Sequence, residues 1–150
     1  MSRVRGRGNK NTELEMIDLF RKHRITGWRR NARVFGSPDF VFPKLRIAVF
    51  VDGCFWHNCP IHRSMPASNR PFWKQKLQRN KTRDHLVGHR LRGIGWKVVR
   101  VWQHELTRTN RRKVAKRIAR LLCGNISRAA NAPIACHLAE TLKIDKSRYE

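Results

Sequence analysis

The spacing of apolar residues along the 150-residue chain separates helical from extended stretches. Apolar side chains that recur every three or four residues predict an amphipathic helix, and apolar side chains that alternate predict a strand with one covered face. We therefore expect helices over about 13–23 and 71–92 and one that ends at Gly124, and strands over 28–34, 39–42, 46–51 and 96–102. This order predicts an α/β (α+β) fold, with a small mixed β-sheet flanked by helices.

Polar residues predict where these helices begin. Thr12 and Glu15 have the spacing of a capping box at the start of the first helix. Asn69 followed by Pro71 is typical of a cap and a first helical turn, so it predicts the start of the second helix. Thr109 is expected to cap the last helix.

The run from residue 39 to residue 52 predicts a hairpin with two acids at its mouth. Pro43 and Lys44 separate the two short strands and are expected to form the turn. The first strand of a hairpin starts at the end where the second strand finishes, so Asp39 and Asp52 should meet there. Converging carboxylates supply the oxygen ligands that Mg²⁺ prefers, which predicts a magnesium site.

Directly after Asp52 the potential ligands change from oxygen to sulfur and imidazole. Cys54, Cys59 and His62 have the close spacing of a zinc knuckle that lacks a fourth ligand. Cysteines in a reducing compartment are more often metal ligands or inert thiols than disulfides. The sequence therefore predicts a metal-binding loop beside the hairpin.

The chain carries 34 Lys and Arg against 10 Asp and Glu, a net charge of +24, which predicts a polyanionic partner. No apolar run approaches the ~20 residues of a membrane-spanning helix, which favours nucleic acid over a membrane. The basic N-terminus has no apolar stretch of the kind found in signal peptides, so we expect a cytoplasmic protein. Lys81 and Arg83 lie on the basic face of the second expected helix and are candidate DNA-binding residues.

The length predicts a single domain. Residues 1–11 are rich in Gly and Arg and should form a flexible basic arm, and residues 12–124 should form the folded domain. Residues 125–150 have weak patterning and are expected to be a tail whose role the sequence does not indicate.

Several segments resemble the very short patch repair (Vsr) family of DNA mismatch endonucleases, a branch of the PD-(D/E)xK nucleases. They are Pro-Asp-Phe-Val at 38–41, Val-Phe-Val-Asp-Gly-Cys-Phe-Trp-His at 49–57, Phe72-Trp73, Asn80 with Arg83-Asp84, and Gly95-Trp96-Lys97-Val98 running into Val101-Trp102. The resemblance covers about residues 12–124. Cys54 stands where the PD-(D/E)xK pattern has its lysine.

The resemblance implies a restriction-endonuclease-like fold and a catalytic centre. It implies that Asp39 binds the catalytic Mg²⁺ and that His57 is the catalytic histidine in place of the missing lysine. It places Glu13 near the active site, where the favourable helix dipole also explains an acid. Some family members carry a histidine at the Asp52 position, so a role for Asp52 as a second metal ligand is left open.

The resemblance also implies a structural zinc held by Cys54, Cys59, His62 and His104. It implies that Phe55 and Trp56 wedge between the bases of mismatched DNA, although an aromatic pair can equally be part of a core. A further wedge from the N-terminal arm would fall on Met1 or Val4.

The expected function is thus Mg²⁺-dependent nicking of double-stranded DNA beside a T:G mismatch, which starts very short patch repair. A mismatch lacks two-fold symmetry, which favours a monomer, with other repair proteins as partners. Two alternatives stay open: a restriction-associated nuclease of the same fold with another target, and a non-catalytic zinc-stabilised nucleic-acid-binding protein. Carboxylates repel phosphate, so the acids disfavour the second alternative.

Overall fold

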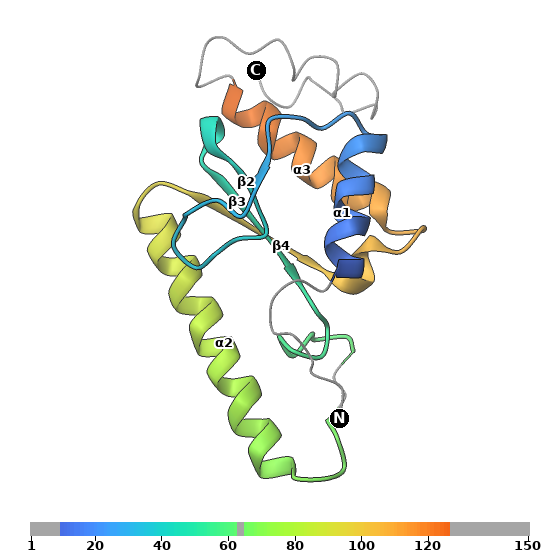
Figure 1. Ribbon diagram of the computed structural model, residues 1–150, viewed down its shortest axis with the longest axis vertical. Coiled ribbons are helices and arrows are strands. Elements are labelled where there is room, and N and C mark those ends of the chain that lie inside the picture. The colour runs from blue at the N-terminus through green and yellow to red at the C-terminus, as the bar shows by residue number, and fades with distance from the viewer. Residues whose placement is uncertain (1–9, 63–64, 127–150) are drawn as a thin grey trace.

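The structure is a computed structural model that describes residues 10–62 and 65–126. In chain order its elements are α1 (Lys10–Lys22), β1 (Arg29–Arg30), β2 (Phe40–Phe42), the 3₁₀ turn η1 (Pro43–Leu45), β3 (Ile47–Asp52), α2 (Arg70–Gly93), β4 (Lys97–Trp102), the 3₁₀ turn η2 (Gln103–Leu106) and α3 (Arg111–Ile126). The four strands form one sheet flanked by the helices, which confirms the expected mixed α+β fold (Figure 1). None of the described helices is long and apolar enough to cross a membrane.

The sheet has the strand order β1-β2-β3-β4. β2 and β3 pair antiparallel, with Phe42 opposite Ile47, and η1 forms the turn of the predicted hairpin. β3 and β4 pair parallel, with Asp52 opposite Trp102, and α2 makes the crossover between them. Because parallel strands end at the same edge of a sheet, the segments that follow β3 and β4 emerge side by side.

The two faces of the sheet pack against different helices. Alternate residues of β3 point to opposite faces: Ile47 and Val49 join a core with α1 and α3, whereas Ala48 and Phe50 join a smaller core with α2. Figure 1 shows α1 and α3 together on one side and the long α2 on the other. Asp52 follows Ala48 and Phe50 in this alternation, so its side chain lies on the α2 side.

The predicted capping box of the first helix is wrong. α1 begins at Lys10, so Thr12 and Glu15 lie inside the helix. Thr12 is buried together with Met16 and Phe20, because all three fall on the helix face that covers the sheet. The helix also ends one residue earlier than expected, at Lys22.

The expected strand over 28–34 is much shorter. β1 contains only Arg29 and Arg30, because Asn31 adopts a left-handed conformation with φ of 52° that ends the extended backbone. Trp28 packs instead against Phe20 and Phe40, and its Nε1 donates a hydrogen bond to the carbonyl of Ile25.

α2 matches the expected range within one residue at each end. Asn69 occupies its cap position, but in a left-handed conformation and without a side-chain hydrogen bond to the helix. The expected cap of the last helix is wrong by one residue: the carbonyl of Asn110, not a group of Thr109, accepts the first hydrogen bonds of α3. α3 also continues two residues past Gly124. α1 reaches two residues into the predicted basic arm, and the rest of the arm and most of the tail lie outside the described residues.

Candidate functional site

The chemically distinctive residues gather at the edge of the sheet where β3 and β4 end. Asp52 closes β3 and Trp102 closes β4, and the loop 53–62 and η2 follow them. A βαβ crossover leaves this carboxyl edge open for ligands, because the connecting loops rather than the helices border it.

Asp39 reaches the end of β3, as the hairpin argument predicts. Its Oδ2 accepts a 2.7 Å hydrogen bond from the backbone N–H of Val51. Burial raises the pKa of Asp39 from 3.8 to about 6, and the negative charges of Glu13 and Asp52 add to the rise, although the Val51 hydrogen bond opposes it. A carboxylate destabilised in this way gains from a nearby cation.

Glu13 comes from the first turn of α1, and its negative charge lies close enough to Asp39 to raise the pKa of that carboxyl. Its carboxylate forms an ion pair and hydrogen bond with the guanidinium of Arg30. The structure therefore brings Glu13 toward the site, but already paired with a basic partner that the sequence did not indicate.

Asp52 is almost fully buried, with 3% of its surface exposed. Both of its oxygens accept hydrogen bonds from Arg100 of β4, from Nε at 2.5 Å and from Nη2 at 2.9 Å. Asp39 and Asp52 thus meet at the hairpin mouth with different surroundings. Asp52 has a bidentate arginine partner, whereas Asp39 is bonded to a backbone N–H.

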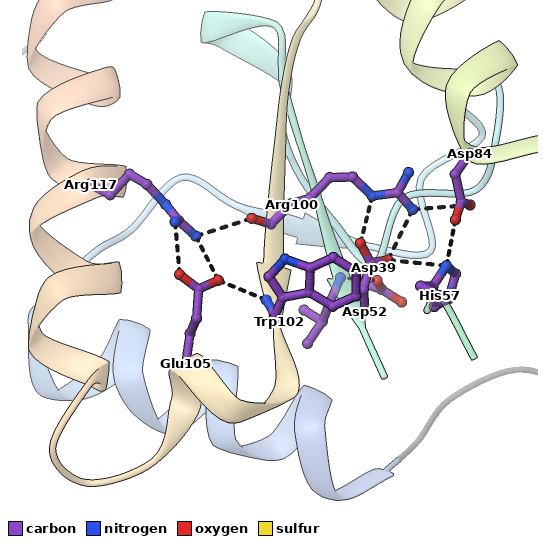
Figure 2. A network of polar contacts seen from close by, with 9 residues as sticks. Asp39, Asp52, His57, Asp84, Arg100, Trp102, Glu105 and Arg117 are labelled. Carbon is purple, nitrogen blue, oxygen red and sulfur yellow. Dashed lines mark hydrogen bonds and ion pairs between the residues drawn. The ribbon is translucent and has the colours of Figure 1, made fainter. Parts of the chain in front are cut away.

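His57 is held by a carboxylate of α2. Its Nδ1 lies 2.6 Å from Oδ2 of Asp84 and 3.7 Å from Oδ1 of Asp52. Arg100 Nη2 lies 3.0 Å from the other oxygen of Asp84, so one guanidinium joins both acids beside the imidazole (Figure 2). Although burial alone would raise the pKa of Asp84, the contacts with His57 and Arg100 lower it overall. Because Nδ1 contacts Asp84, any proton transfer by this imidazole would use Nε2.

Sequence reasoning missed Asp84 and Arg100 as site residues, although Asp84 lies in one of the segments that carry the resemblance. Arg100 had one usable signal, a basic residue between the apolar Val99 and Val101 of a strand. Its partners depend on the pairing of β3 with β4 and on the rotation of α2, which the sequence pattern does not give.

Cys54, Cys59, His62 and His104 converge next to this network. One ligand atom from each residue lies within 4.8 Å of every other, so the group could hold a metal ion. Sγ of Cys54 lies 3.2 Å and Sγ of Cys59 lies 3.5 Å from Nδ1 of His104. Two sulfurs and two imidazoles at such spacings suit a closed tetrahedral zinc site, in which ligand atoms are roughly 3.3–3.8 Å apart.

Local contacts hold the cluster together. Glu105 of η2 accepts hydrogen bonds from Arg117 of α3 and from the backbone N–H of Trp102, which fixes the turn that carries His104 (Figure 2). Although burial alone would raise the pKa of Glu105, these bonds lower it overall. On the other side, Asn80 of α2 donates a 3.0 Å hydrogen bond to the carbonyl of Trp56, which ties the loop to the helix.

Phe55 and Trp56 pack against Trp73 at the start of α2. The ring of Phe55 lies 5.0 Å from that of Trp56 and 5.3 Å from that of Trp73, and all three residues are half-buried. The ammonium of Lys76 lies 5.0 Å from the Trp56 ring. None of these rings belongs to the two buried cores of the described residues. Trp73, which the sequence analysis placed in a segment that carries the resemblance but gave no role, completes this aromatic cluster.

A cleft of about 340 Å³ lies between α2 and the ends of β3 and β4. Its lining includes Asp52, His57, Lys81, Asp84, Arg92 and Arg100. Lys81 therefore opens into the same space as Asp52 and His57. Asp39 and Glu13 do not line this cleft, and neither does Arg83, which is exposed on the helix.

Comparisons with known proteins bear on the family that the chain resembles. A sequence profile of the family described as DNA mismatch endonuclease Vsr matches residues 1–63, which include the hairpin, the loop 53–62 and three of the four clustered Cys and His residues. This match confirms the resemblance to the Vsr family that the motifs suggest.

Curated relatives have corresponding names. The chain is 52% identical over 69 residues to the type II nicking enzyme V.NaeI of Lentzea aerocolonigenes, a match covering 46% of this chain and 42% of that protein. It is 42% identical over 84 residues to the type II nicking enzyme V.NmeDIP of Neisseria meningitidis serogroup C, covering 54% and 57%. It is 33% identical over 100 residues to the DNA mismatch endonuclease Vsr of Escherichia coli K12, covering 63% and 64%. The matches span about half the length of these relatives.

Proposed function

We propose, from the match of residues 1–63 to the Vsr family, that this protein is a metal-dependent DNA endonuclease that nicks one strand of a duplex. The observation that carries the proposal is the contact between His57 and Asp84 at the edge of the sheet. The side chain of Asp39 is bonded to Val51 near the end of β3, at the same edge. Both Asp39 and His57 lie near Asp52, so an acid and an imidazole lie close to the same buried carboxylate.

Asp39 fits a site for Mg²⁺. One of its oxygens is fixed by the N–H of Val51, and its charge is destabilised by burial and by two neighbouring acids. When bound, Mg²⁺ supplies charge stabilisation at the phosphate and lowers the pKa of a water nucleophile. The chain's contribution is to hold the carboxylate in place, and no basic side chain among residues 10–62 and 65–126 forms an ion pair with it.

His57 acts as the proton-transfer group. Asp84 fixes the imidazole through Nδ1, so Nε2 keeps one orientation and accepts a proton from the attacking water or donates one to the leaving oxygen. Glu13 acts indirectly, because its charge adds to the field at Asp39 while Arg30 holds its carboxylate.

The four-residue cluster of Cys54, Cys59, His62 and His104 holds a structural zinc in this proposal. A site closed by four protein ligands has no open position for chemistry, so its role is to fix the loop that carries His57.

DNA binding involves the basic α2 helix and the aromatic cluster. Lys81 in the cleft and Arg83 on the exposed helix surface bind backbone phosphates. Phe55 and Trp56 insert at a weakly stacked base step, since unstacking costs a few kcal/mol and least at a mismatch. Their half-buried packing on Trp73 supports a platform of rings at the edge of the fold.

The finer proposal is that the protein nicks beside a T:G mismatch and thereby starts very short patch repair. Purified zinc-loaded protein should nick a T:G duplex with Mg²⁺ and leave the matched duplex intact. If the folded, zinc-loaded protein cleaves none of the substrates tested, the proposal that it is an endonuclease is refuted.

A second candidate is a restriction-associated nuclease of the same fold that is directed at another target; two relatives are named type II nicking enzymes and not mismatch endonucleases. A panel of every mismatch in varied sequence contexts distinguishes the two, because each predicts a different preferred substrate. A non-catalytic binding protein predicts that Asp39→Asn leaves all measured properties toward DNA unchanged.

A further inference from the structure

Arg100 lies between two acids that both face His57. Its Nε and Nη2 donate to the two oxygens of Asp52 at 2.5 Å and 2.9 Å, and Nη2 lies 3.0 Å from Oδ1 of Asp84. Figure 2 shows the guanidinium of β4 reaching across to the acid of β3 and the acid of α2. Three elements that are distant in the sequence thus meet through one cation.

This arrangement leaves Asp52 poorly suited to bind a metal. The residue is 3% exposed, its charge is already balanced, and each oxygen accepts a hydrogen bond from the arginine. A divalent cation on Asp52 would lie against a guanidinium and would have to displace it, because like charges at such separations repel strongly in a buried site.

Asp39 differs on each of these points. Among the described residues it forms no ion pair, and the charges that act on it are those of the acids Glu13 and Asp52. Its Oδ2 accepts a hydrogen bond from the backbone N–H of Val51, and no side chain of the described residues bonds to Oδ1, so Oδ1 is the oxygen offered to a metal. The two aspartates at the hairpin mouth are therefore not an equivalent pair of ligands.

We propose that Arg100 is a positioning residue that replaces a second metal ion: its guanidinium balances Asp52 and Asp84, holds Asp84 behind His57, and leaves a centre that binds one divalent cation at Asp39. This inference rests on the proposed catalytic metal at Asp39. It excludes Asp52 as a ligand and assigns the residue to the support of the imidazole instead.

The test counts Mn²⁺ ions bound by the zinc-loaded full chain without DNA, by electron paramagnetic resonance of free Mn²⁺. The wild type and Asp52→Asn should each bind one Mn²⁺ with affinities within about threefold of each other, and Asp39→Asn should weaken binding by at least about tenfold. Arg100→Met should gain a second Mn²⁺ ion, because it leaves Asp52 and Asp84 without a cation. Arg100→Lys should keep one, because an ammonium still balances the acids.

Two Mn²⁺ ions in the wild type, or a loss of about tenfold or more in Asp52→Asn, would overturn the proposal. Zinc content and thermal unfolding verify that each variant is folded. If Arg100→Met does not fold, the Mn²⁺ binding of Asp52→Asn and Arg100→Lys still tests whether Asp52 is a metal ligand. Nicking is measured separately. A wild type that binds one Mn²⁺ but cleaves no DNA would refute the proposed function and not the role of Arg100.

Discussion

Nδ1 of His57 and Oδ2 of Asp84 lie 2.6 Å apart, which joins the loop after β3 to the middle of α2. The contact sets both the orientation of the imidazole and the nitrogen available to a substrate. If His57 transfers the proton, its efficiency depends on this carboxylate.

Asp84→Asn is therefore expected to slow nicking by roughly 10²-fold, since positioned acid–base groups contribute about 10²–10⁴-fold. Zinc content and DNA affinity should stay unchanged, because Asp84 is not among the four clustered ligands. Single-turnover nicking kinetics measure the effect. Asp18→Asn is the control, as Asp18 is an exposed acid of α1 that pairs with Arg111. Equal rates for the two variants would contradict the role of Asp84.

Asp39→Asn is expected to abolish nicking and yet stabilise the fold. Burial, with Glu13 and Asp52, raises the pKa of Asp39 from 3.8 to about 6. Since the folded-state pKa lies above the unfolded one, ionisation opposes folding, and the cost grows from about pH 4 and levels off above about pH 6. At about 1.4 kcal/mol per pKa unit, the wild type carries a cost of about 3 kcal/mol at neutral pH.

Thermal unfolding of the zinc-loaded wild type and the zinc-loaded Asp39→Asn variant, both without Mg²⁺, checks this expectation. The variant should be the more stable at about pH 8, and its advantage should roughly halve at about pH 5, where the folded wild type keeps the proton. Mg²⁺ should stabilise the wild type alone, because ligands of the native state raise its stability. An advantage that does not change with pH would show that burial of the charge is not its source.

Cys59→Ser is expected to remove the bound zinc and to destabilise the protein. Cys59 is fully buried and lies between His62 and His104, so losing one of four ligands opens the site. Metal analysis should find about one zinc per wild-type chain and little in the variant. Cys123→Ser is the matched control, because Cys123 lies in α3 outside the cluster. Equal zinc contents in both variants would refute the assignment.

The parts of this molecule that sequence could predict are those governed by short-range rules. The hairpin followed from the apolar runs around Pro43, which placed Asp39 and Asp52 at one end. The ligand spacing of Cys54, Cys59 and His62 likewise depends on one loop. His104 came from the family resemblance, and the structure brings it to the same cluster across the parallel pairing of β3 and β4.

What the sequence did not reveal depends on packing between distant elements. The capping box failed because the apolar face of α1 extends back through Thr12, and burial outweighs a local hydrogen-bonding signal. The contact of Arg100 with Asp52 depends on the register of β3 and β4, and the contact of Asp84 with His57 depends on the rotation of α2. Neither contact produces a periodic pattern in the sequence. Propensity and spacing thus located the site, and tertiary contacts determine which of its acids can bind a metal.

Trp56→Ala is expected to reduce discrimination between mismatched and matched DNA. The ring packs on Phe55 and Trp73 beside Lys76, at the edge of the fold and outside both cores, so its loss costs little stability. If the rings stack on unpaired bases, each contributes about 1–3 kcal/mol to binding of the opened site, which corresponds to roughly 5- to 150-fold in affinity for the mismatched duplex. Affinity for matched DNA, where phosphate contacts dominate, should change little. Phe35→Ala removes an exposed ring that lies under Arg90 of α2, and it serves as the control in fluorescence anisotropy titrations of both duplexes. An equal loss of affinity for the two duplexes in Trp56→Ala would mean that the ring supports the fold of the loop and does not read the mismatch.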